Sequence, residues 1–175
     1  MDALAQNLTG VIVEMALKMG LSRAPLSLNY PCASLARMLG VPARPQAVKA
    51  ALDAFFAART GLFGAVQVEA HEDGFCLTIP AEGVARVVSQ APAAAFLRDL
   101  IHTAQLPGAT AEDLLAAFRR HSSHVHVEPV DNDEFDWLVY FEDGVPDDFR
   151  YCIDTHDGFA SYHRFSKEDY EAFGF

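Results

Sequence analysis

The spacing of hydrophobic residues changes along this chain, and the change restricts the folds open to it. Through the first third of the chain, apolar side chains recur at the three- and four-residue spacing of amphipathic helices. The expected helices cover residues 3–19, 32–39 and 46–59. Pro31 suits the first turn of the second helix and Gly40 its end. We expect residues 21–29 to form a loop.

Beyond the third helix the spacing shortens to two residues, which is typical of strands. Alternating apolar residues occupy positions 65–70 and again 75–79, and Glu72-Asp73-Gly74 supplies the turn between them. The pattern predicts a β-hairpin. Residues 81–91 show no clear period, so no element is assigned there.

The second half repeats this succession of helix and strand. Residues 92–105 are amphipathic, and Thr110 with Asp113 three positions later is a capping box that starts another helix. Ser166 with Asp169 marks the start of a short terminal helix in the same way. The expected strands cover residues 125–129, 135–141, 149–154 and 160–165, with a hairpin turn at 156–158.

These patterns predict an α+β fold. Its N-terminal half is helical with a β-hairpin, and its C-terminal half is a helix packed on a four-stranded antiparallel sheet. We place the two parts at residues 1–88 and 89–175. No long linker separates them, so the halves can also pack as one domain.

Acidic side chains are concentrated in the second half. The net charge is −11; residues 1–85 hold six Lys/Arg and seven Asp/Glu, whereas residues 86–175 hold seven and seventeen. An extended anionic surface repels nucleic-acid phosphates and attracts basic partners. We therefore expect a protein partner with a basic surface rather than a nucleic acid; the alternative interpretation is that the acidic residues only keep the fold soluble. The candidate surface residues are Glu142, Asp143, Asp147 and Asp148.

Several classes of protein are disfavoured. No stretch is long and apolar enough for a membrane span, so no membrane partner is expected. Cys32, Cys76 and Cys152 are far apart and form no CxxC pair, which predicts neither a disulfide framework nor a zinc ribbon and favours the cytoplasm. No phosphate-binding glycine loop occurs. We predict no cofactor and assign no catalytic residue.

Histidines offer a candidate metal site in the second half. His124 and His126 are two positions apart on an expected strand, so they share a face of it. With His163 from another strand they could hold zinc and leave one coordination position open. No HExxH or HxxxH spacing is present, and unligated histidines on a solvated strand are the alternative interpretation.

Two further chemical patterns are incomplete. The acidic run 131–136 resembles a calcium loop, but Phe135 and Asp136 stand where an oxygen ligand and a glycine are required. Cys152 lies near His156 and His163 in sequence, and a thiolate nucleophile needs such an imidazole within hydrogen-bonding distance. The alternative is that Cys152 packs as a small hydrophobic residue.

The N-terminal half resembles the winged helix-turn-helix of bacterial regulators over about residues 1–80. The segment Ser34-Leu35-Ala36-Arg37-Met38-Leu39-Gly40-Val41-Pro42 is similar to the first helix and turn of that motif. Residues 46–58 would then be the recognition helix and residues 66–79 the wing. The resemblance implies that this helix enters the DNA major groove, with Arg44 and Lys49 as the candidate contacts.

The charges of this segment depart from the family pattern. Asp53 lies on the same helix as Lys49, and the wing carries Glu69, Glu72 and Asp73 where cations would contact phosphates. From these observations we expect a cytoplasmic, non-catalytic interaction or regulatory protein. The alternatives are a DNA-binding winged-helix regulator and a metal-dependent enzyme that uses the histidines.

Overall fold

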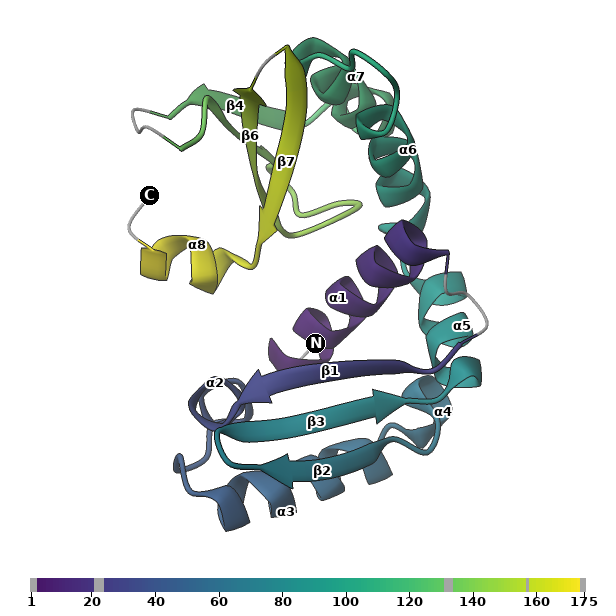
Figure 1. The fold of residues 1–175 in the computed structure, drawn as a ribbon, viewed down its shortest axis with the longest axis vertical. Coiled ribbons are helices and arrows are strands. Elements are labelled where there is room, and N and C mark those ends of the chain that lie inside the picture. The colour runs from purple at the N-terminus through teal and green to yellow at the C-terminus, as the bar shows by residue number, and fades with distance from the viewer. Residues whose placement is uncertain (1–2, 21–23, 131–133, 157, 174–175) are drawn as a thin grey trace. The chain divides into compact units, whose positions relative to one another are not determined.

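The computed structural model describes residues 3–20, 24–130, 134–156 and 158–173. It divides the chain into two compact units, Met1–Ala91 and Pro92–Phe175, called here the N-terminal and the C-terminal unit. Each unit combines helices with a small antiparallel sheet (Figure 1). The predicted α+β class is confirmed. Among the described residues, no helix combines the length and apolar character needed to cross a bilayer.

The N-terminal unit contains five helices and a three-stranded sheet among its described residues. In chain order the elements are α1 (Ala3–Met19), β1 (Leu26–Pro31), α2 (Cys32–Leu39), α3 (Pro45–Ala57), α4 (Thr60–Phe63), β2 (Gln67–His71), β3 (Gly74–Ile79) and α5 (Ala81–Gln90). The sheet order is β1-β3-β2, with all pairs antiparallel. Leu4, Leu8 and Ile12 of α1 are fully buried, which explains the helical spacing of that segment.

One prediction for this unit was wrong, and one segment left without an assignment is a helix. Residues 26–31, expected in a loop and at a helix start, form strand β1: Leu26 and Leu28 are buried and alternate with exposed neighbours. The segment without a clear period forms α5. Gly83 allows α5 to pack closely on α4, because a Cβ at this position would lie 1.9 Å from the carbonyl oxygen of Phe63.

The third predicted helix ends at Ala57, two residues earlier than expected. The Thr60 hydroxyl donates to the carbonyl oxygens of Phe56 and Ala57, which satisfies groups that the helix leaves open at its end. A separate short helix, α4, then brings Phe63 against Phe55 and Phe56, with ring centroids 6.1 and 5.8 Å apart.

The C-terminal unit is a four-stranded meander covered by helices. Its elements are α6 (Ala94–Ala104), α7 (Ala111–His121), β4 (Val125–Pro129), β5 (Trp137–Phe141), β6 (Arg150–His156), β7 (Phe159–Phe165) and α8 (Lys167–Phe173). The strand order is β4-β5-β6-β7. Both predicted caps are confirmed: the amide of Asp113 donates to the Thr110 hydroxyl, and that of Asp169 to the Ser166 hydroxyl.

The meander has a buried residue layer on each face. Helices α6 and α7 lie side by side against one face (Figure 1), where Phe96, Phe118, Phe141 and Tyr151 form an aromatic cluster. Leu138 and Cys152 belong to the second layer, together with Phe135 and the half-buried Tyr170 of α8. Because both faces are covered, all five positions of β5 are apolar, as are the consecutive buried residues Tyr151, Cys152 and Ile153 of β6.

Candidate functional site

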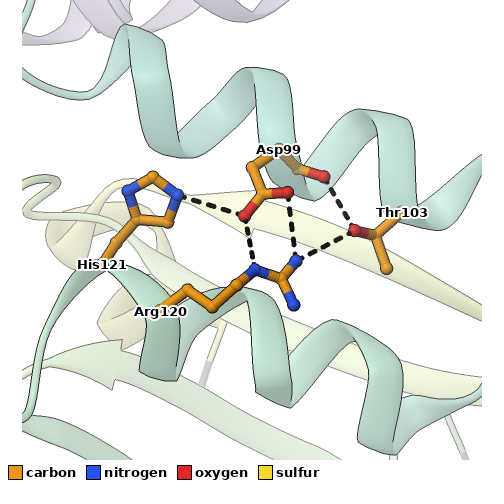
Figure 2. Close-up of polar contacts among 4 residues, drawn as sticks. All are labelled: Asp99, Thr103, Arg120 and His121. Carbon is orange, nitrogen blue, oxygen red and sulfur yellow. Dashed lines mark hydrogen bonds and ion pairs between the residues drawn. The ribbon is translucent and has the colours of Figure 1, made fainter.

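A carboxylate-centred cluster joins α6 to α7 (Figure 2). Arg120 Nε and Nη2 each donate to Asp99 at 3.0 Å, and His121 Nε2 lies 3.1 Å from the same carboxylate. Arg120 Nη2 also donates to the Thr103 hydroxyl at 3.4 Å, and that hydroxyl donates to the backbone carbonyl of Asp99. The hydrogen bond from Arg120 lowers the pKa of Asp99 against a smaller opposing effect of burial.

A groove of about 360 Å³ lies beside this cluster. Its lining combines Asp99, Thr103 and Arg120 with the residues of the α6–α7 turn and one face of each helix, namely His102, Leu106, Pro107, Gly108, Ala109, Asp113 and Ala116. The lining contains no serine or cysteine, and the Thr103 hydroxyl is already engaged. Asp99 accepts hydrogen bonds from two side chains of α7, Arg120 and His121. The cluster therefore links the two helices and does not have the arrangement of a nucleophile beside its base.

A second polar region lies between β5 and β6, where residues 142–148 of the connection 142–149 are called here the acidic loop. Glu142, Asp143 and Asp148 are exposed on it. The Glu142 amide donates to the carbonyl of His124 at 3.0 Å, and the Val145 amide donates to Asp143 Oδ1 at 3.1 Å. Gly144 turns the chain at φ +69°, so close to Asp148 that a Cβ would lie 3.2 Å from its carboxylate. These contacts fix the loop and present three carboxylates outward.

Asp147 was predicted on the acidic surface, and this was wrong: its side chain is only 6% exposed. Arg164 of β7 donates to both of its carboxylate oxygens at 2.9–3.0 Å, and the Tyr151 hydroxyl donates to it as well. The Arg164 guanidinium lies 3.5 Å from the Phe149 ring centroid. A buried carboxylate loses its hydration, and these hydrogen bonds and the ion pair with Arg164 offset that loss.

Sequence reasoning missed Arg164 and Tyr151. A run of adjacent acidic residues has no period that tells which one points inward. The only sequence signal was an arginine close to Tyr162 and Phe165 in a strand of the predicted sheet.

The three histidines predicted as metal ligands do not meet. His124 precedes β4 and lies 3.5 Å from Asp143, whereas His126 on β4 lies 3.2 Å from Glu128 and stacks on Tyr140. His163 is on β7, at the opposite edge of the sheet. Within the described ranges, no group of three His, Cys, Asp or Glu side chains is arranged to hold a metal ion. The predicted zinc site is therefore corrected.

The remaining chemical patterns carry no site either. Cys152 is fully buried, and burial raises the pKa of its thiol to about 11, so it is not a thiolate at neutral pH. The alternative of a packed hydrophobic cysteine describes it better. Asp131, Asn132 and Asp133 of the calcium-like run lie outside the described residues.

The DNA-contact candidates of the N-terminal unit are placed differently from each other. Arg44 is exposed and directly precedes α3. Lys49 lies within α3 and its ammonium group contacts both carboxylate oxygens of Asp53 at 2.7 Å. Lys49 is thus partly neutralised by its own helix.

The division into units sharpens the charge asymmetry. The N-terminal unit holds seven Lys/Arg and seven Asp/Glu, a net charge of zero. The C-terminal unit holds six and seventeen, so it carries the whole net charge of −11. Three of its six cations, Arg119, Arg120 and Arg164, are already paired with carboxylates of the same unit.

Comparison with known proteins gives one finding. A family model described as "Domain of unknown function, E. rectale Gene description (DUF3877)" matches residues 1–174. No curated protein and no solved structure matches the chain.

Proposed function

The chain belongs to the DUF3877 family, and we propose that it is a non-catalytic interaction protein whose C-terminal unit binds a basic segment of another protein. The observation that carries the proposal is the partition of charge: one unit is neutral and the other carries −11. A fold of this size does not need such an excess of one sign, since like charges destabilise the compact state.

The acidic loop is the part of this surface best suited to a partner. Hydrogen bonds of the Glu142, Gly144 and Val145 amides order the backbone that carries the exposed Glu142, Asp143 and Asp148, so less backbone entropy is lost when a ligand binds. Complementary charge accelerates the encounter with a basic partner and makes binding sensitive to salt. A segment rich in Lys and Arg matches this chemistry.

We also propose a winged-helix arrangement for the N-terminal unit. The element order α1-β1-α2-α3-α4-β2-β3, in which only the four-residue α4 separates α3 from the hairpin, and the sheet order β1-β3-β2 support it. The second candidate function follows from this arrangement: DNA binding through α3, favoured by the exposed Arg44. The ion pair of Lys49 with Asp53 and the exposed Glu69, Glu72 and Asp73 oppose it, because each phosphate contact needs an available cation.

Fluorescence anisotropy separates the two functions. The whole chain is titrated into a labelled Lys/Arg-rich peptide, a labelled Glu-rich peptide of equal length and a labelled random DNA duplex, each at several salt concentrations. The proposal predicts binding of the basic peptide alone, weakening as salt rises. Binding of the duplex alone would instead support the regulator, and no binding of the basic peptide at low salt would refute the interaction function.

A further inference from the structure

A buried polar network anchors the acidic loop at Asp147. Arg164 and Asp147 have side chains only 2% and 6% exposed, yet they carry opposite full charges. Arg164 Nε also donates to the Tyr151 hydroxyl at 2.9 Å, and Tyr151 is fully buried. Arg164 belongs to β7 and Tyr151 to β6, so the network ties the loop to two strands of the sheet.

Stability alone does not account for this network. A buried ion pair loses its hydration, and its replacement by well-packed apolar residues is often neutral or stabilising. Its distinctive property is geometric. The planar guanidinium of Arg164 donates to both oxygens of the Asp147 carboxylate and therefore fixes both the position and the orientation of that carboxylate. The carboxylate it fixes, Asp147, directly precedes the exposed Asp148 and follows the turn that carries Glu142 and Asp143.

We propose that Arg164 is a positioning residue for the partner site: by gripping Asp147 it holds the acidic loop in the one conformation that presents Glu142, Asp143 and Asp148 together to a Lys/Arg-rich segment. This inference rests on the proposed function. Arg164 itself does not touch the partner, since its side chain is covered. Its contribution is to order the loop before the partner arrives, which reduces the entropy lost on binding.

The test replaces the network as a whole by apolar residues, in the triple variant Arg164→Met, Asp147→Leu and Tyr151→Phe. Because no buried polar group of the three is left without its partner, we expect a melting temperature within about 5 °C of the parent chain. Amide hydrogen exchange at Gly144 and Val145, whose amides are bonded within the loop, should accelerate by at least about tenfold. The affinity for the Lys/Arg-rich peptide should fall by about tenfold, with core amides unchanged.

The outcomes separate this inference from the proposed function. A triple variant with parental exchange at Gly144 and Val145 and parental affinity overturns the positioning role. If the parent chain binds no basic peptide, the proposed function fails, and the hydrogen exchange alone decides whether Arg164 orders the loop. If the triple variant does not fold, Arg164→Lys replaces it, because lysine keeps the charge but lacks the two-pronged grip. Faster exchange confined to the loop then supports the inference, and unchanged exchange refutes it.

Discussion

The two units are built alike and charged differently. Both combine a small antiparallel sheet with helices, and both bury clusters of phenylalanine. In the N-terminal unit the described lysines contact nearby acids, Lys18 with Glu14 and Lys49 with Asp53, each at 2.7 Å. In the C-terminal unit carboxylates outnumber cations by eleven. The comparison teaches that apolar packing determines the architecture of both units, whereas the charge excess is a separate property that the architecture does not require.

The largest effect concerns what the units share. Phe118→Ala opens the aromatic cluster with Phe96, Phe141 and Tyr151, and Phe63→Ala opens the one with Phe55 and Phe56. Both rings are fully buried, so each change should lower the free energy of unfolding of its own unit by about 3–5 kcal/mol. Urea denaturation followed by residue-resolved NMR measures this. If the free energy of unfolding fell by less than about 1 kcal/mol in either unit, the two units would not depend on their aromatic clusters alike.

The next effect concerns what the units do not share. Glu142→Gln with Asp143→Asn and Asp148→Asn removes three exposed charges from the acidic loop, and should weaken the Lys/Arg-rich peptide about tenfold or more at low salt. The matched control removes the same number from the other unit, through Glu69→Gln, Glu72→Gln and Asp73→Asn. Anisotropy should show little change for this control. Equal losses in both variants would mean that net charge, and not the loop, attracts the peptide.

A capping box fixes the start of one helix of the C-terminal unit. Helix α7 begins with the Thr110–Asp113 capping box, whereas its neighbour α6 and, in the N-terminal unit, α2, α3 and α5 begin without a hydrogen bond from a capping side chain. Thr110→Ala leaves an amide of the first turn without its acceptor and should destabilise the C-terminal unit by about 1 kcal/mol. Thermal unfolding checks this. Thr110→Ser keeps the hydroxyl and should restore the melting temperature; a failure to do so would assign the loss to packing.

The smallest effect is pH-dependent. The pKa of Asp99 is lowered mainly by its hydrogen bond from Arg120, so its stabilising contribution is present above the ordinary carboxyl range and is lost as pH falls through the lowered pKa. Since both side chains are partly exposed, Asp99→Asn should cost at most about 1 kcal/mol at pH 7. The urea midpoints of variant and parent should converge as the pH falls through this lowered pKa. A constant difference at all pH values would contradict the assigned cause.

Much of the architecture was accessible from the sequence because it is recorded locally. The helix ending at Gly40, the capping box at Thr110 and strand β4 depend on neighbours a few residues apart. Strand β1 was missed because β3, the strand it pairs with in the described part of the chain, lies about fifty residues later, and Leu26 and Leu28 alone give too short an alternation.

The candidate site was harder to predict, because it also depends on contacts between residues far apart in the sequence. The inward turn of Asp147 is decided by Arg164, a residue of another strand, and adjacent aspartates look alike in sequence. The separation of His163 from His126 depends on strand order, which alternation along one strand does not encode. The net charge could be counted from the sequence, whereas which of the carboxylates are exposed could be learned only from the structure.

The most direct test of the central claim is a titration of the isotope-labelled chain with the Lys/Arg-rich peptide, followed by ¹H–¹⁵N correlation spectra. The account predicts that saturable shifts concentrate on the acidic loop and on His124, whose carbonyl accepts from Glu142, while α3 and the β2–β3 hairpin stay unperturbed. Shifts centred on the N-terminal unit, or uniform small shifts that never saturate, would contradict it.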